Sequence, residues 1–170
     1  MSELEKLDAG KPYYFLDDEV AARKANAAKL CQEFNEIPAT QPEKQTEKIK
    51  QIFGKTGERV SVQATFNCDN GKNISVGEDF LSNYNLTILD IAPVKMGHNV
   101  MIGPNVDIYT VNHPLDAKAR RHYMLKASRL QSATTSGSVV RSQLCQGSPS
   151  AATLSLPPVQ SLPRTSLIIR

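Results

Sequence analysis

The sequence predicts a mainly β fold, a parallel β-helix preceded by an α-helical N-terminal segment, and three observations lead to this prediction. Apolar residues within residues 3–53 recur at helical spacing. From Val60 onward the spacing changes, and apolar residues recur every six positions. This period fits neither an α-helix nor simple strand alternation, and it is typical of short strands that turn corners in a coil. Glycines follow the periodic positions closely, at points where a tight corner favours a residue without a Cβ atom.

Two helices are expected in the N-terminal segment. Asp17 and Asp18 can cap the first helix, which ends before Pro38. Its apolar positions are Val20, Ala27, Cys31 and Phe34. The second helix begins near Pro42 and ends at Gly54. Its apolar face carries Ile49, Ile52 and Phe53.

The six-residue register defines the β region. Its members are Val76, Ser82, Ile88, Val94, Val100 and Val106, and a parallel register holds Met96, Ile102 and Ile108. The glycines expected at corners are Gly77, Gly97 and Gly103. An ordinary set of strands with coincidental spacing is the alternative. We expect a helical segment over residues 1–58, β-helix coils with a closing loop over 59–125, and an irregular tail over 126–170.

The composition fits a globular domain and argues against two classes of partner. The chain has 170 residues, 40% hydrophobic and 22% charged, and no apolar run approaches the ~20 residues of a membrane span. The net charge of +3 is unevenly distributed, since residues 1–126 carry 16 basic and 17 acidic residues. Residues 127–170 carry four arginines and no acidic residue. Four dispersed arginines form no basic patch, so we expect no nucleic acid and no membrane as partner.

Cysteine usage and the N-terminus together predict a cytoplasmic protein. The residues after Met1 lack the basic and apolar regions of a signal peptide. Cys31, Cys68 and Cys145 are odd in number and widely spaced, which favours reduced thiols over a disulfide or a zinc site. The three histidines show no ligand spacing, so no metal is expected.

Residues 109–116 hold the side chains best suited to chemistry. This run closes the six-residue register, and Pro114 breaks the repeat directly after His113. A histidine at the exit of a rigid β scaffold can accept a proton from a hydroxyl group at neutral pH. A hydrogen-bonded structural histidine is the alternative interpretation of the same pattern. His98, in a Gly-His-Asn corner, and His122, in a basic run, are both expected to be exposed.

Several short motifs along the chain point to one family. They are Ala9-Gly10-Lys11, Asn73-Ile74-Ser75-Val76-Gly77-Glu78, Asn83-Tyr84-Asn85, Ile88-Leu89-Asp90, Val100-Met101-Ile102-Gly103-Pro104-Asn105-Val106 and His113-Pro114-Leu115-Asp116. With these motifs the chain resembles the maltose and galactoside O-acetyltransferases, a branch of the hexapeptide-repeat, left-handed β-helix acyltransferases. The resemblance covers about residues 3–125, and its last motif is specific for the branch.

The resemblance implies transfer of an acetyl group from acetyl-CoA to a hydroxyl of a sugar, in a homotrimer whose active sites lie between subunits. On the family pattern His113 is the general base, and Asn83 and Asp69 match positions that contact the acceptor. Asp17 is a further candidate for an acceptor contact, although the run Tyr13-Tyr14-Phe15-Leu16-Asp17 departs from the family pattern. The family's acetyl-CoA-binding positions lie in later coils, whose motifs are absent from this chain.

The last 44 residues depart from the family, because they hold ten serines and none of the expected hexapeptides. If the triplets are read one base earlier, residues 127–141 permit the run G-K-P-V-T-I-G-N-N-V-W-I-G-G-A. Residues 146–151 then permit P-G-V-T-I-G, and residues 157–167 permit A-A-G-A-V-V-T-K-D-V-P. The hypothesis is a one-base slip near residues 125–127 that produced an out-of-frame tail. A natural serine-rich tail is the alternative.

Two functions remain open at this point. The first is a sugar O-acetyltransferase by lineage. The alternative is a catalytically inactive, truncated remnant of such an enzyme, without the acetyl-CoA-binding coils. Neighbouring coils of a solenoid share their core, so loss of the later coils would leave the turn around Val106 and Ile108 with an exposed apolar end and an unpaired edge.

Overall fold

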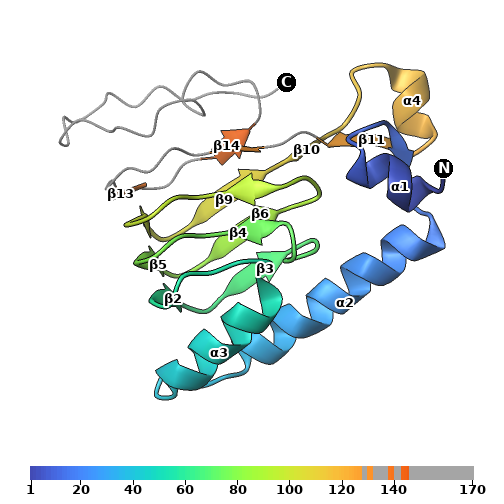
Figure 1. Ribbon diagram of the computed structural model, residues 1–170. Coiled ribbons are helices and arrows are strands. Elements are labelled where there is room, and N and C mark those ends of the chain that lie inside the picture. The colour runs from blue at the N-terminus through green and yellow to red at the C-terminus, as the bar shows by residue number, and fades with distance from the viewer. Residues whose placement is uncertain (128–129, 132–137, 140–142, 146–170) are drawn as a thin grey trace.

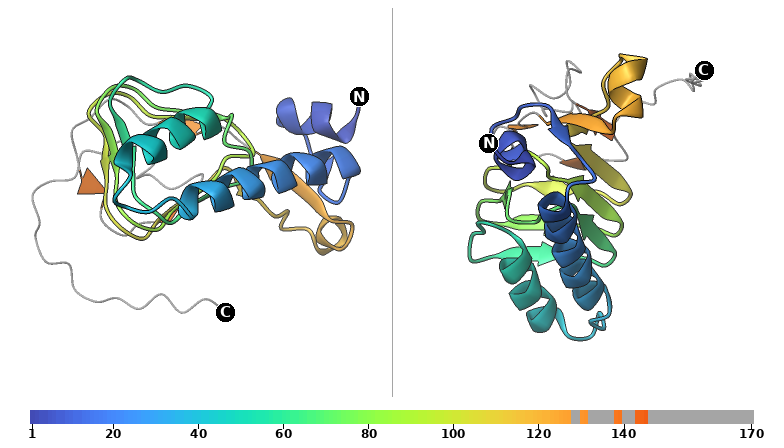
Figure 2. Two further views of the ribbon diagram at one scale, coloured as in Figure 1. Left: turned by 90° about the horizontal axis from the view of Figure 1, so that it is seen from below. Right: turned by 90° about the vertical axis from the view of Figure 1, so that its right-hand side faces the viewer.

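The structure is a computed structural model that describes residues 1–127, 130–131, 138–139 and 143–145. Two helices lie at one end of a stack of short strands, and successive coils of the chain lie above one another (Figure 1). Viewed along the stack, the coils superimpose into one closed outline (Figure 2). The predicted parallel β-helix with a helical N-terminal segment is therefore confirmed.

The N-terminal segment is helical for most of its length. It contains α1 (Glu3–Asp8), β1 (Tyr13–Tyr14), α2 (Asp18–Asn35) and α3 (Pro42–Ile52). The carboxylate of Asp17 caps α2 by accepting hydrogen bonds from the N–H groups of Glu19 at 3.0 Å and Val20 at 3.3 Å. Pro42 opens α3 at a position where a missing N–H costs no hydrogen bond. None of the helices in the described part of the chain has the length and apolar character to cross a lipid bilayer.

The coils of the β-helix form three parallel sheets. Their strands are β2 (Val60–Val62), β3 (Phe66–Cys68), β4 (Ile74–Ser75), β5 (Phe80–Ser82), β6 (Leu86–Leu89), β7 (Val94–Lys95), β8 (Met101–Ile102) and β9 (Val106–Tyr109). One sheet contains β2, β5 and β8, the next contains β3, β6 and β9, and the third contains β4 and β7. Each strand of one coil therefore stacks on the equivalent strand of the coil before it.

A coil takes 20 residues, because Val60 pairs with Phe80 and Leu86 pairs with Val106. Strand β4 begins eight residues after β3, whereas β5 and β6 each begin six residues after the preceding strand. All nine periodic positions of the sequence are buried. The six-residue period in the sequence nevertheless does not tell which residues stack on one another in successive coils. Ile88 pairs with Ile108, 20 residues later, and not with Val106, 18 residues later. We call the corner with two extra residues, formed by residues 69–73 and 90–93, the long edge.

Asparagine and aspartate take the left-handed backbone conformation at the other two corners. The φ angle is 61° at Asn85 and 57° at Asn105, and these two side chains are hydrogen-bonded at 3.0 Å. Asp79 and Asn99 have φ angles of 56°. The expectation that a corner needs a residue without a Cβ atom is confirmed for Gly77, because a Cβ atom there would lie 2.7 Å from the carbonyl oxygen of Gly97.

One apolar core runs from the helices into the coils. The ring of Phe66 on β3 lies 6.3 Å from that of Phe34 on α2 and 5.4 Å from that of Phe53 after α3, measured between ring centroids. All three side chains are fully buried. Helices α2 and α3 therefore close the end of the stack that begins with β2 and β3.

A second, smaller core holds the closing loop against the N-terminus. The loop contains β10 (Val111–Asn112), α4 (Ala117–Arg121) and β11 (Met124–Ala127). Strand β11 pairs antiparallel with β10 on one side and with β1 on the other, so Tyr13 lies opposite Leu125. Leu7, Val20 and Ile91 are buried in the same cluster.

Three short pieces of the predicted irregular tail are described, and each of them forms strand. They are β12 (Leu130–Gln131), β13 (Ser138–Val139) and β14 (Gln143–Cys145). They pair in parallel with β7, β8 and β9, which adds one strand to each of the three sheets. The rest of the predicted tail lies outside the described residues.

Candidate acetyl-transfer site

Asp69 lies on the long edge, directly after β3. Its N–H group donates a hydrogen bond to the carboxylate of Asp90, one coil further on, at 3.1 Å. Its own carboxylate lies 3.0 Å from the ammonium group of Lys24 on α2, and the Asp69 side chain is only 12% exposed. The predicted acceptor residue is thus held by the coil stack on one side and by a helix on the other.

Two aromatic residues of the N-terminal segment surround this ion pair. The ammonium nitrogen of Lys24 lies 5.5 Å from the ring centroid of Phe15. Tyr13 is buried, and its pKa is raised to about 12, first by burial and then by the negative charge of Asp69. The phenol therefore stays neutral beside the carboxylate and retains its proton as a hydrogen-bond donor.

His113 follows β10, which leaves the stack at the long edge. Thr110 anchors this departure, because its hydroxyl donates a hydrogen bond to the carbonyl of Leu89 at 2.7 Å and accepts one from the N–H of Ala92 at 2.9 Å. Thr110 is 1% exposed, whereas His113 is exposed. A fixed support therefore carries an imidazole that solvent and ligands can reach.

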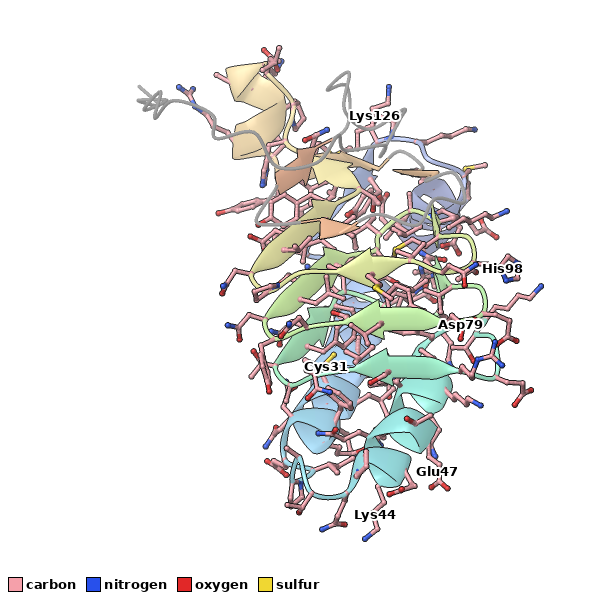
Figure 3. All side chains as sticks on the ribbon, turned by 90° about the vertical axis from the view of Figure 1, so that its left-hand side faces the viewer. Cys31, Lys44, Glu47, Asp79, His98 and Lys126 are labelled. Atoms are coloured by element: carbon pink, nitrogen blue, oxygen red, sulfur yellow. The ribbon has the colours of Figure 1, made fainter. Side chains whose placement is uncertain are left out.

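His113 lines a cavity of about 400 Å³ between the closing loop and the N-terminal segment. The other lining residues are Pro12, Asn112, Pro114, Ala119, Met124, Leu125 and Lys126. Most of these side chains are apolar. Lys126, the charged member of the lining, is labelled near the upper end of the molecule in Figure 3. The cavity can accept an uncharged group next to the imidazole, with a cation in the same wall.

Asn83 lies at a different corner of the coil from the other two predicted site residues. It follows β5, where the chain turns towards β6, and its N–H donates to the carbonyl of Ile102 at 2.9 Å. Its side-chain oxygen accepts a hydrogen bond from the N–H of Tyr84 at 2.8 Å. Within one chain, Asp69 and the departure of the His113 loop share the long edge, and Asn83 does not.

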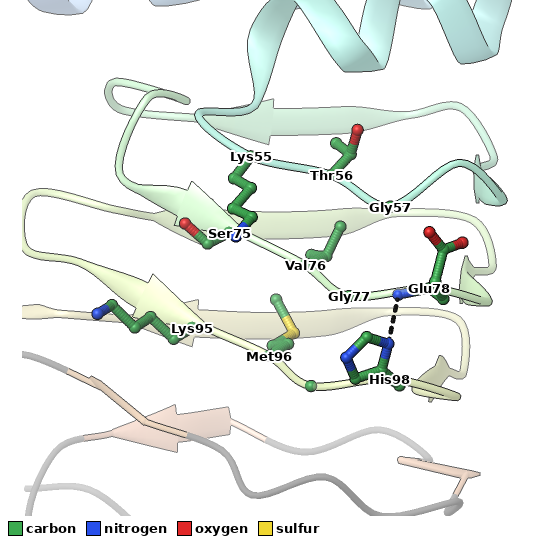
Figure 4. Close-up of a pocket in the computed structure, with 11 residues that line it drawn as sticks. Lys55, Thr56, Gly57, Ser75, Val76, Gly77, Glu78, Lys95, Met96 and His98 are labelled. Atoms are coloured by element: carbon green, nitrogen blue, oxygen red, sulfur yellow. Dashed lines mark hydrogen bonds between the residues drawn. The ribbon is translucent and has the colours of Figure 1, made fainter.

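The remaining candidates have other surroundings. One carboxylate oxygen of Asp17, Oδ1, caps α2, and a contact of Asp17 with the acceptor stays a prediction. His98 and His122 are exposed, as expected. His98 accepts a hydrogen bond from the N–H of Glu78 at 3.0 Å and lines a different pocket, of about 460 Å³, with Lys55 and Lys95 (Figure 4).

Sequence reasoning missed Lys24, Asp90 and Thr110. Asp90 interrupts the apolar run from Ile88 to Ala92, and a single charged residue in such a run is a signal for a buried polar contact. Residues 70, 90 and 110 are also 20 positions apart, but that spacing has meaning only once the length of the coil is known. The described residues contain no group of three or more potential metal ligands.

Comparisons with known proteins agree with this architecture. A family model described as the maltose acetyltransferase hexapeptide capping motif matches residues 6–57. The galactoside O-acetyltransferase of Escherichia coli K12 is 32% identical over 122 residues, covering 72% of this chain and 60% of that protein. A solved structure of galactoside acetyltransferase in complex with coenzyme A superimposes with a TM-score of 0.70 at 28% identity, over 76% of this chain and 64% of the other.

The solved maltose O-acetyltransferase from Clostridium difficile 630 superimposes with a TM-score of 0.74 at 38% identity. That match covers 76% of this chain and 69% of the solved one. The chain spans about three fifths of the length of the curated relatives it matches. On this identity, the coverage and the shared coil architecture, the chain belongs to the maltose and galactoside O-acetyltransferase branch of the hexapeptide-repeat, left-handed β-helix acyltransferases.

Proposed function

We propose that this protein transfers an acetyl group from acetyl-CoA to a hydroxyl group of a sugar, with His113 as the general base. One observation carries the proposal: an exposed histidine lines a cavity and is joined through Thr110 to the edge of the stack that carries Asp69. Two of the matched proteins are named a galactoside O-acetyltransferase and a maltose O-acetyltransferase, and these names support a sugar as acceptor.

His113 has the chemistry and the access for proton transfer. A ring nitrogen of neutral imidazole accepts the proton of the acceptor hydroxyl as its oxygen attacks the acetyl carbonyl, and it returns the proton to the departing thiolate. The hydrogen bonds of Thr110 keep the start of the loop fixed during this exchange. General base catalysis of this kind contributes about 10²- to 10⁴-fold to a rate.

Asp69 and Asn83 bind the acceptor in this proposal. A carboxylate accepts hydrogen bonds from sugar hydroxyls, and an amide both donates and accepts them. The ammonium group of Lys24 contacts Oδ1 of Asp69, so Oδ2 can accept a hydrogen bond from the acceptor sugar. These contacts orient one hydroxyl group of the sugar towards the acetyl carbonyl, and they take no part in the proton transfer.

The cavity beside His113 fits the reactive end of acetyl-CoA. Acetyl-CoA supplies the acetyl group as a thioester and leaves as coenzyme A. Pro114, Met124 and Leu125 offer the apolar contacts that an acetyl group and its thiol arm require. Lys126 is the cation in the same wall and would face a negatively charged part of the donor.

A homotrimer completes the site in this proposal. Asn83 lies at another corner from the long edge, so a neighbouring subunit is needed to bring an Asn83 next to a His113. Exposed apolar side chains lie near Asn83: Tyr84 is 55% exposed, and Leu81 and Met101 are register partners on the outer side of one sheet. Light scattering on a sizing column tests this assembly, and a monomer at micromolar concentration would contradict it.

The competing function is an inactive remnant of the same lineage. The absence of the later hexapeptide motifs from residues 127–170 favours this alternative. The remnant would fold in its first coils and bind the acceptor, but it would lack the wall for the nucleotide end of coenzyme A.

One assay separates the two functions. Release of coenzyme A from acetyl-CoA is measured with and without maltose or methyl β-galactoside, for the parent chain, His113→Ala and His98→Ala. Acceptor-dependent release that His113→Ala lowers at least 100-fold, and His98→Ala leaves unchanged, supports the enzyme. No release by the parent, with release by a frame-corrected chain, supports the remnant. An equally active His113→Ala protein would overturn the assignment of the base.

A cytoplasmic location is part of the same proposal. Cys31 and Cys68 are buried free thiols whose sulfur atoms lie 3.5 Å apart, and Cys31 lies within the lower part of the molecule in Figure 3. Thiols at this separation stay reduced in a reducing compartment. Detection of a Cys31–Cys68 disulfide in protein isolated from its native cells would contradict the location.

A further inference from the structure

Asp90 is a buried carboxylate at the long edge that the proposed reaction does not use. Its side chain is 0% exposed. One carboxylate oxygen, Oδ1, accepts hydrogen bonds from the N–H of Asp69 at 3.1 Å and from the N–H of Asn70 at 2.8 Å. The side chain of Asp90 in the second coil therefore holds the backbone of the first coil at Asp69, the proposed acceptor-binding residue.

A second set of hydrogen bonds connects the same two coils in the opposite direction. The side-chain amide of Asn73 donates to the carbonyl of Asp90 at 2.9 Å and to the carbonyl of Ile91 at 3.0 Å. The turn over residues 69–73 is thus fixed at both ends to the coil above it. Asp69 begins this turn, and its backbone has little freedom left.

The other oxygen of Asp90 makes no hydrogen bond within the described part of the chain. Burial raises the pKa of Asp90 to about 6, although the N–H of Asn70 opposes this shift by stabilising the charged form. A buried carboxyl group with one unpaired oxygen costs stability, so stability alone does not account for an aspartate here. The two hydrogen bonds that Asp90 accepts from backbone N–H groups indicate a role in holding the turn at residues 69 and 70 instead.

We propose that Asp90 is a positioning residue that fixes the backbone of Asp69 and so aims the Asp69 carboxylate at the acceptor. The inference rests on the proposed function, because it gives Asp90 a role in the same acceptor site. Lys24 holds the Asp69 side chain from the helix, and Asp90 holds its backbone from the coil. Without Asp90 the carboxylate loses one of its two supports while its ion pair persists.

The experiment measures acceptor affinity directly, without acetyl transfer. Maltose and methyl β-galactoside are titrated calorimetrically into the full chain, Asp90→Ala and Asp90→Asn. The amide keeps a side-chain oxygen for the two N–H groups and places its nitrogen where Oδ2 has no partner. Asn35→Ala is the matched control, because Asn35 also makes two hydrogen bonds to the backbone of the first coil, at Phe66, but away from the long edge.

Asp90→Ala is expected to weaken acceptor binding about tenfold, which is about 1.4 kcal/mol. Asp90→Asn should stay within about twofold of the parent, and Asn35→Ala should lose stability without losing affinity. Amide hydrogen exchange at Asp69 and Asn70 should accelerate in Asp90→Ala and not in Asp90→Asn.

The two levels of the inference fail in different ways. Equal affinity of Asp90→Ala and the parent would overturn the positioning role alone. The same holds for an equal loss in Asn35→Ala, which would mark the effect as one of general stability. A parent chain that binds neither sugar would overturn the acceptor site of the proposed function, and the positioning role with it.

Discussion

The ammonium nitrogen of Lys24 lies 3.0 Å from a carboxylate oxygen of Asp69, and this ion pair ties α2 to the first coil of the β-helix. The two residues are far apart in sequence, and they meet because α2 packs against β3. The contact matters for function because Asp69 is the proposed acceptor residue on the long edge. The helical segment therefore shapes the candidate site as well as closing the stack.

The Lys24–Asp69 pair should couple the two residues energetically. The Lys24 side chain is 34% exposed and that of Asp69 is 12% exposed, so solvent weakens the attraction. We expect a coupling energy of about 1 kcal/mol in a double-mutant cycle of Lys24→Met and Asp69→Asn, measured by urea unfolding. Strictly additive losses of stability would show that the pair contributes nothing.

Asp90 should make stability depend on pH in a recognisable direction. An unfolded aspartate titrates near pH ~3.9, whereas burial raises the pKa of Asp90 to about 6. Its stabilising contribution is complete below the unfolded pKa, where both states are protonated, and it is lost as pH rises through the folded pKa.

Comparison with Asp90→Asn isolates this effect from the other carboxylates. The free energy of unfolding of the parent, minus that of the variant, should fall by about 3 kcal/mol between about pH 4 and about pH 7. Urea unfolding at several pH values in this range provides the measurement. A difference that stays constant with pH would mean that Asp90 titrates as an ordinary aspartate.

Thr110 should be needed for both stability and the position of the His113 loop. Thr110→Val keeps the shape of the side chain but leaves the buried N–H of Ala92 without its partner, whereas the carbonyl of Leu89 keeps the hydrogen bond from the N–H of Thr110 at 3.1 Å. The expected loss is about 1–3 kcal/mol for this one unsatisfied group, measured by urea unfolding.

A control for this substitution is Thr46→Val. The hydroxyl of Thr46 donates to the carbonyl of Val60 at 3.2 Å, on the side of the stack that the helices cover. Both variants should lose stability, but only Thr110→Val should also lower the turnover of an active, frame-corrected chain. If both variants kept full turnover, Thr110 would be no more than a structural residue.

The frame hypothesis predicts a specific result from the coding DNA. Reading the gene one base earlier from near residues 125–127 should yield the hexapeptides G-N-N-V-W-I-G-G and P-G-V-T-I-G, followed by V-V-T-K-D. Sequencing independent isolates of the gene provides the measurement. Codons that exclude these motifs in the neighbouring frame would leave the serine-rich tail as a natural one.

Local signals in the sequence predicted the helices and the buried face of the coils well. Asp17 and Pro42 mark the starts of α2 and α3, because capping and the fixed φ angle of proline act within one turn of helix. The periodic apolar positions are all buried, because every side of a coil points alternate side chains inward.

The sequence alone did not predict features that depend on how successive coils are aligned. The extra two residues at the long edge keep the six-residue spacing intact in the sequence, so Ile88 and Val94 look equivalent although they face different partners. The contact of Tyr13 with Leu125 joins distant segments in an antiparallel pair with no local signal. For the same reason the sequence alone did not separate Asn83 from the corner that carries Asp69.

Helices α2 and α3 close one end of the stack, so the β-helix has a fixed floor and can be lengthened or shortened only at the opposite end. Asp69, the proposed acceptor-binding residue, lies in the coil next to these helices. The loop with His113 begins after the strand β9, two coils further on. On the proposed function, changes at that opposite end would act on the donor side of the reaction before they reached Asp69. The proposed donor and acceptor sites thus lie at different heights of the stack, and a change in the later coils can leave the first coil and its helices unchanged.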